Sequence, residues 1–284
     1  MHGIHVALVT PFTSGGGIDA KSLDRLARHC LDHGASGLVA LGTTGEGPLL
    51  TDAERRTVLD VCRAVAIEYG VPLTVGAGTM GTADTIAQAR ERALYADALL
   101  TVVPYYLRPS DDAVVDHFAA VGAAVDVPLL VYDVPYRTGK HLPAETLLRL
   151  LDLDAVTGVK HCPGGIGRDT LALLASGTSK AVLCGDDPYV YPMLRLGAAG
   201  AIAASACLAP AAFAALDTTC GPSLHHTLVP LTEALFAEPS PAVLKACLAA
   251  RGLIDDPGVR APMAPPRQEN VRRALGALRA LDER

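Results

Sequence analysis

Between residues 4 and 204, eight short apolar runs alternate with longer stretches in which apolar residues recur at helical spacing. The runs are the length of strands and the stretches between them are the length of helices. Strands that alternate regularly with helices pair in parallel through crossovers, and eight such units favour a closed barrel over an open sheet. The sequence therefore predicts the α/β class and a (β/α)8 TIM barrel. The predicted strands are 4–9, 37–41, 72–76, 98–103, 128–132, 156–160, 181–184 and 200–204.

Beyond residue 204 the pattern is helical only. Four helices are predicted there, at 208–218, 224–237, 241–251 and 268–281. The first is interpreted as the eighth barrel helix, and the proline-rich segment 255–266 as a stiff loop. We therefore expect a barrel over residues 1–220 and a C-terminal helical extension over residues 221–284.

Composition excludes several classes of protein. The net charge is −6, and no Lys/Arg run interleaved with aromatic residues is present, which argues against nucleic-acid binding. No apolar run approaches the roughly 18 to 20 residues of a membrane span, and no signal-peptide pattern is visible. The seven cysteines are scattered and form no C-x-x-C pair, which is typical of reduced thiols. A cytoplasmic protein is expected.

Two motifs could indicate other chemistry. Residues 76–81 match G-x-G-x-x-G, with Asp97 about 20 residues further on, so an NAD-dependent oxidoreductase is a rival interpretation. The motif lies in the third unit of a barrel, however, and a tight turn between strand and helix is favoured. His29 and His33 are one helical turn apart but lack a third ligand, so no metal site is predicted.

Lys160 ends the predicted strand 156–160, which is an unusual position for a charged side chain. One interpretation is that its methylenes lie along the apolar rim while the ammonium reaches water. The other is that burial lowers the pKa of Lys160, so that a neutral amine can attack a ketone and form a Schiff base. Position alone leaves both open.

Other reactive side chains follow the predicted strands at the same end of the barrel, where active sites of this fold lie. A Schiff-base enzyme needs a proton shuttle, for which Tyr132 is the candidate, with Thr43 and Tyr106 as relay members. Arg137 could clamp a carboxylate. Taken singly, the threonine could be a turn residue, Tyr106 a core or interface aromatic and Arg137 a surface ion pair. Their joint placement favours the functional interpretation.

Six motifs resemble the dihydrodipicolinate synthase and N-acetylneuraminate lyase family of class I aldolases, closest to its synthase branch. They occur in family order and at family spacing over nearly the whole chain. The motifs are Gly42-Thr43-Thr44-Gly45-Glu46, Pro104-Tyr105-Tyr106, Tyr132-x-Val134-Pro135-x-Arg137-Thr138-Gly139, Gly158-Val159-Lys160, Gly185-Asp186-Asp187 and Glu238-Pro239-x-Pro241.

This resemblance implies a mechanism. Lys160 would form an imine with pyruvate, and Tyr132 would donate and accept protons. Thr43 and Tyr106 would complete the relay, with Tyr106 supplied by a neighbouring subunit. Such enzymes are typically homotetramers, built as dimers of dimers, and need no metal or organic cofactor.

The resemblance also implies a set of substrate-binding residues. Thr44 and Ile202 would line the pyruvate site, with Gly185 beside them. Arg137 would hold the carboxylate of aspartate 4-semialdehyde. The expected product is 4-hydroxy-tetrahydrodipicolinate, an intermediate of lysine and diaminopimelate biosynthesis.

Several residues near the predicted mouth depart from the family pattern. His161 and Cys162 follow Lys160, where the family usually has an acidic residue and then a small one. Leu107 and Asp133 each replace an asparagine. A paralogous pyruvate-dependent aldolase acting on another aldehyde or sugar acid is therefore an alternative. A non-catalytic keto-acid binder is another, although such a protein has no need of the amine.

Overall fold

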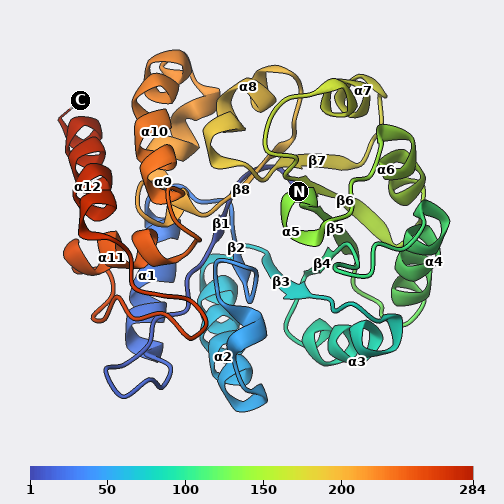
Figure 1. Cartoon of the computed structure of the whole chain (residues 1–284), viewed down its shortest axis with the longest axis horizontal. Coiled ribbons are helices and arrows are strands. Elements are labelled where there is room, and N and C mark those ends of the chain that lie inside the picture. The colour runs from blue at the N-terminus through green and yellow to red at the C-terminus, as the bar shows by residue number, and fades with distance from the viewer. Residues whose placement is uncertain (284) are drawn as a thin grey trace. The chain divides into compact units, whose positions relative to one another are not determined.

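All eight predicted strands form, and the predicted TIM barrel is confirmed (Figure 1). The computed structural model describes residues 1–283. The strands are parallel and hydrogen-bonded in sequence order into a closed barrel. They are β1 (Gly3–Ala7), β2 (Gly37–Ala40), β3 (Leu73–Ala77), β4 (Ala98–Val102), β5 (Leu129–Asp133), β6 (Val156–His161), β7 (Ala181–Cys184) and β8 (Gly200–Ala203).

Helices follow the strands as the alternating pattern predicts. They are α1 (Ala20–Asp32), α2 (Asp52–Tyr69), α3 (Thr82–Ala93), α4 (Asp111–Gly122), α5 (Pro135–Thr138), α6 (Ala144–Leu151), α7 (Arg168–Ala175), α8 (Val190–Arg195) and α9 (Pro210–Ala214). The one-turn helix α5 was not predicted, because a single turn has no periodicity to detect. The helix predicted at 208–218 is shorter than expected. It begins at Pro210, whose missing N–H suits a first helical position, and it ends in a 3-10 turn at Ala215–Asp217.

The C-terminal extension consists of α10 (Gly221–Leu235), α11 (Ala242–Ala250) and α12 (Gln268–Asp282). Helix α12 packs against α10 and α11. The predicted proline-rich loop, 255–266, contains neither helix nor strand. These three helices confirm the predicted helical pattern of the C-terminus.

By internal contacts the chain divides into two compact units. One unit comprises residues 1–3 and 72–202, with β3 to β7, most of β8 and α3 to α8. The other comprises residues 4–71 and the chain from residue 203 onward, with most of β1, β2, α1, α2 and α9 to α12. The expected boundary at residue 220 stays a prediction.

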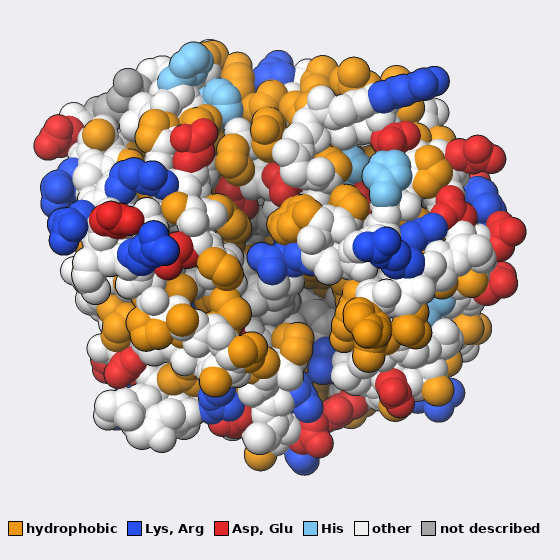
Figure 2. All heavy atoms as spheres, in the orientation of Figure 1, with side chains coloured by type: hydrophobic (Ala, Val, Ile, Leu, Met, Phe, Trp, Pro, Cys, Tyr) orange, Lys and Arg blue, Asp and Glu red, His pale blue; other side chains and the backbone are white. Residues whose placement is uncertain are grey.

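The distribution of surface charge and the lengths of the helices agree with the classes that the composition excludes. Figure 2 shows acidic and basic side chains interspersed over the face that it presents, with no continuous block of one sign. Within residues 1–283, no helix has the length and apolar content that crossing a bilayer requires.

Candidate active site

Lys160 and Tyr132 lie side by side at the ends of two neighbouring strands. The register of β5 and β6 pairs Tyr132 with Lys160, so both side chains point to the same face of the sheet. The Lys160 ammonium nitrogen lies 4.4 Å from the centre of the Tyr132 ring. Each residue is only 7% exposed. The interpretation in which Lys160 extends its ammonium into water is therefore wrong, and the buried lysine instead faces a phenol.

Gly185, directly after β7, leaves the space that the Lys160 side chain occupies. Its backbone N–H donates to the carbonyl of His161 at 2.9 Å, which continues the β6–β7 ladder by one residue. A methyl group at position 185 would lie 2.8 Å from Cε of Lys160 and 2.0 Å from Sγ of Cys162. Any side chain there would displace the lysine, so the glycine supports the site by its small size.

The protonation of Lys160 differs from the sequence-based expectation. Burial lowers the pKa of the lysine, as expected. The acidic groups around it, first Tyr132 and then Cys162 and Asp187, raise the pKa by more, so the net pKa lies above the ordinary lysine value. The expectation that burial sets the direction of the Lys160 pKa shift is therefore wrong, because the surrounding acidic groups reverse it. An ammonium is not a nucleophile, so amine chemistry at this position would need a base, and the Tyr132 phenol and the Cys162 thiol are the acid–base groups beside Lys160.

Two further predicted residues lie on or beside α5. Arg137 is exposed, and its guanidinium carbon stands 5.5 Å from the centre of the Tyr136 ring. Tyr106 is 81% exposed and has a left-handed backbone conformation, with φ of 68°. Its N–H donates to the carbonyl of Thr138 at 3.1 Å, which ties the loop after β4 to α5. In the single chain, the Tyr106 ring is a surface group.

Arg108 is a second cation beside α5, and no sequence pattern indicated it. A methyl group at Gly139, which ends α5, would lie 3.1 Å from Nε of Arg108. Arg108 also has a left-handed backbone, with φ of 49°. Its sequence position, between Leu107 and a proline, carries no periodic signal that could have identified it.

Thr43 and Thr44 follow β2 in the second compact unit, within a tight glycine-rich turn. Thr44 is buried, at 8% exposure. The turn closes through a hydrogen bond from the Gly45 N–H to the Gly42 carbonyl at 3.1 Å. A methyl group at Gly47 would lie 2.4 Å from the carbonyl oxygen of Leu41, so that position accepts only glycine. The glycines thus let the turn fold back closely on the end of its own strand.

A buried ion pair fixes the same turn. The Lys245 ammonium, on α11, donates to Glu46 at 3.0 Å and to the Thr10 carbonyl at 2.9 Å. The second carboxylate oxygen of Glu46 accepts from the Arg260 backbone N–H at 2.8 Å. Burial lowers the pKa of Lys245. Sequence analysis overlooked this lysine, although a charge within the otherwise apolar stretch of α11 was a usable signal.

Ile202 is fully buried in β8, at the end of the first compact unit. Among the other predicted residues, the structure brings Tyr132, Lys160 and Gly185 together, while Arg137 and Tyr106 lie on the surface beside α5.

The dinucleotide interpretation of residues 76–81 does not fit the structure. Gly78 has φ of 130° and forms a tight turn after β3. The carboxylate of Asp97 accepts from the Leu73 N–H at 2.8 Å, at the opposite end of β3 from that turn. The acidic residue therefore lies at the wrong end of the strand to bind the ribose of a nucleotide held at the glycines.

Comparison with known proteins agrees with this geometry. The sequence pattern of the Dihydrodipicolinate synthetase family matches residues 1–280. The chain is 37% identical over 285 residues to 4-hydroxy-tetrahydrodipicolinate synthase of Moorella thermoacetica, covering 97% of each chain. It is 39% identical to the enzyme of that name from Thermomicrobium roseum, covering 98% of this chain and 94% of the relative.

A solved structure is similar throughout. It is that of dihydrodipicolinate synthase from Acinetobacter baumannii in complex with pyruvate, with 33% identity, a TM-score of 0.93 and 99% of each chain covered. Coverage of both chains is nearly complete, so the similarity extends well beyond a shared fold. Together with the buried lysine–tyrosine pair, these matches show that the chain belongs to the dihydrodipicolinate synthetase family of class I aldolases and lyases.

Proposed function

We propose that this protein condenses pyruvate with aspartate 4-semialdehyde to form 4-hydroxy-tetrahydrodipicolinate. The observation that carries the proposal is the buried Lys160 amine held against the Tyr132 phenol. Relatives that cover nearly the whole chain carry the corresponding name, and the Acinetobacter baumannii enzyme was solved with pyruvate. The proposed reaction needs no metal or organic cofactor.

In the proposed mechanism, Lys160 attacks the C2 carbonyl of pyruvate. The carbinolamine then loses water to give an imine, with Tyr132 returning the proton that the leaving hydroxyl needs. Transfer of a proton from C3 to the Tyr132 oxygen converts the imine to an enamine, whose C3 forms a bond to the aldehyde carbon of the second substrate while the aldehyde oxygen takes up the proton. The amino group of the second substrate then attacks the imine carbon and displaces the Lys160 amine, which closes the ring of the product. We propose that Thr43 and Tyr106 extend the proton relay, and that Thr44, Ile202 and Gly185 line the pyruvate site.

Trapping with borohydride tests this function. Incubation with pyruvate and borohydride is expected to attach the reduced keto acid to Lys160, as peptide mass spectrometry would show. An adduct together with a clear preference for another aldehyde would favour the paralogous aldolase. Binding of pyruvate with no adduct would favour the keto-acid binder.

Arg137→Ala is expected to weaken use of the semialdehyde more than use of pyruvate. Since Arg137 is exposed, we expect kcat/KM for the semialdehyde to fall by about 10-fold, near 1.4 kcal/mol, rather than by the larger loss typical of a buried contact. Steady-state kinetics with each substrate varied in turn measures the difference. Arg149→Ala, at an exposed arginine paired with Asp112, is the control. Equal losses for both substrates would contradict the assignment.

The raised pKa of Lys160 predicts an alkaline rise in imine formation. A lysine with a raised pKa stays protonated at neutral pH, so the neutral amine fraction grows with pH. We expect the trapping rate at low pyruvate to increase roughly tenfold per pH unit between about pH 7 and 9. Circular dichroism over the same range checks that the fold is constant. A trapping rate that does not change with pH would mean that Lys160 is already neutral at pH 7. That result would contradict a raised pKa and would indicate that the lowering of the pKa by burial dominates.

We also propose a cytoplasmic homotetramer, built as a dimer of dimers, that serves lysine and diaminopimelate biosynthesis. The exposed Tyr106 ring supports this proposal, because a residue that acts in a neighbouring subunit must project from its own. Analytical ultracentrifugation of the native protein would measure the assembly. A monomer that retains full activity would rule out a catalytic role for Tyr106 across an interface.

A further inference from the structure

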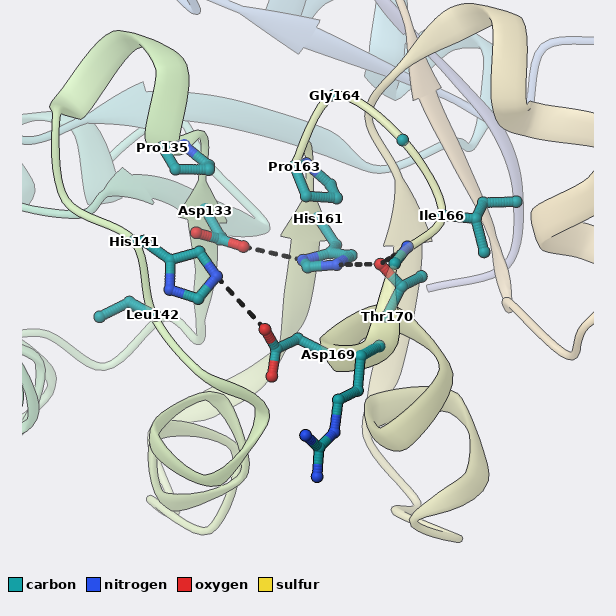
Figure 3. A pocket seen from close by; sticks show the side chains of 13 residues that line it. Asp133, Pro135, His141, Leu142, His161, Pro163, Gly164, Ile166, Asp169 and Thr170 are labelled. Carbon is teal, nitrogen blue, oxygen red and sulfur yellow. Dashed lines mark hydrogen bonds and ion pairs between the residues drawn. The ribbon is translucent and has the colours of Figure 1, made fainter.

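The residues that directly follow Tyr132 and Lys160 form a second polar pair on the other side of the sheet. Successive side chains of a strand point to opposite faces, so Asp133 and His161 point away from the face that carries the phenol and the amine. The register of β5 and β6 pairs them with each other. Oδ2 of Asp133 accepts from Nδ1 of His161 at 2.8 Å, and both residues are 2% exposed (Figure 3).

The pair is tied to helix α7. Nε2 of His161 lies 3.0 Å from the hydroxyl of Thr170, in the first turn of α7. Since a carboxylate can only accept, Nδ1 carries a proton, and Nε2 of a neutral imidazole then accepts from the hydroxyl. The three side chains line a cavity of about 320 Å³ on this outer side, which also contains the His141–Asp169 pair at 3.3 Å. One hydrogen-bonded chain thus links β5, β6 and α7.

This arrangement is costly for stability. Oδ1 of Asp133 is buried and accepts no hydrogen bond from any residue that the structure describes. A buried, half-satisfied carboxylate beside an imidazole is typically less stable than apolar side chains of similar volume. The Asp133–His161 bond lies one residue beyond Tyr132 and Lys160 on both strands. This location indicates that the bond fixes the relative positions of the two strand ends.

We propose that Asp133 and His161 are positioning residues that hold the Lys160 amine against Tyr132. After Asp133 the chain leaves β5 for α5, and after His161 it leaves β6. The side-chain bond therefore adds to the backbone bond from the Cys162 N–H to the Asp133 carbonyl, at 2.8 Å, at the point where both strands end. It limits how far the ends of β5 and β6 can separate or slide, and so limits the distance between phenol and amine.

An exchange of partners tests the proposal, which rests on the function proposed above. His161→Glu places two carboxylates together, and we expect the rate of pyruvate imine formation to fall about 100-fold at about pH 8, as for a small misplacement of reacting groups. Asp133→Asn keeps a neutral acceptor for His161, so a loss of no more than about 5-fold is expected. The double variant D133N/H161E regains a donor and an acceptor and should return to within about 5-fold of the wild type.

Rapid-quench borohydride trapping measures these rates, and urea denaturation measures stability separately. Thr170→Val removes the outer link, together with the bond from the Gly167 N–H to the same hydroxyl at 3.4 Å, and should lower the rate less than H161E does. A double variant no faster than H161E would overturn the proposal, as would an unchanged rate in a folded H161E. Should H161E fail to fold, Asp133→Ala deletes the same bond without adding charge. Its trapping rate should then also fall, and an unchanged rate would overturn the proposal. Failure of the wild type itself to trap pyruvate would instead refute the function.

Discussion

Replacing Lys160 with methionine is expected to abolish condensation, lowering kcat by at least about 10⁴-fold, and to eliminate the borohydride adduct. Methionine fills a volume similar to that of the lysine stem but has no amine. Because nearby acidic groups hold the pKa of Lys160 above its ordinary value, the buried charge contributes to stability, and we expect the free energy of unfolding to fall. Activity and urea denaturation of the same preparation separate loss of chemistry from loss of fold.

Two matched variants sharpen that result. Lys21→Ala removes an exposed lysine of α1 and should leave activity unchanged. Tyr132→Phe keeps the aromatic packing but removes the phenolic proton, so the adduct should still form, more slowly. Condensation by the Lys160→Met protein at the wild-type rate would exclude an imine mechanism altogether.

Replacing Lys245 with methionine is expected to destabilise the protein by about 3 to 5 kcal/mol, because it leaves the Glu46 carboxylate buried without its cation. The Lys245 ammonium also lies 3.9 Å from the centre of the Phe12 ring, a contact that methionine would only partly replace. Urea denaturation followed by circular dichroism measures the loss. Activity at low temperature should fall too, because Glu46 anchors the turn that carries Thr43 and Thr44.

A double variant separates charge burial from packing. In Glu46→Gln with Lys245→Met, neither partner is left as an unpaired charge, so much of the lost stability should return. Disrupting the exposed Arg149–Asp112 pair by Arg149→Ala should cost less than about 1 kcal/mol. A loss of similar size from the buried and the exposed pair would contradict the structural role assigned to Lys245.

Local pattern determined the barrel and singled out the residues proposed to react. Strand and helix periodicity extends over only a few residues, so it could be read directly, and β1 to β8 lie within two residues of their predicted bounds. Because parallel strands end at a common rim, the same pattern brought Lys160 and Tyr132 to one end of neighbouring strands. Glycine at 185 could likewise be selected from its motif.

Only the tertiary structure decided which side chains support these residues. Lys245 and Glu46 are 199 positions apart, and His161 and Asp133 are 28 apart, so neither bond leaves a periodic trace in the sequence. The direction of the Lys160 pKa also depended on which acidic groups surround the amine, and not on burial alone. Hydrogen bonds and charges act through space over a few ångströms, and the chain brings such partners together only when it folds.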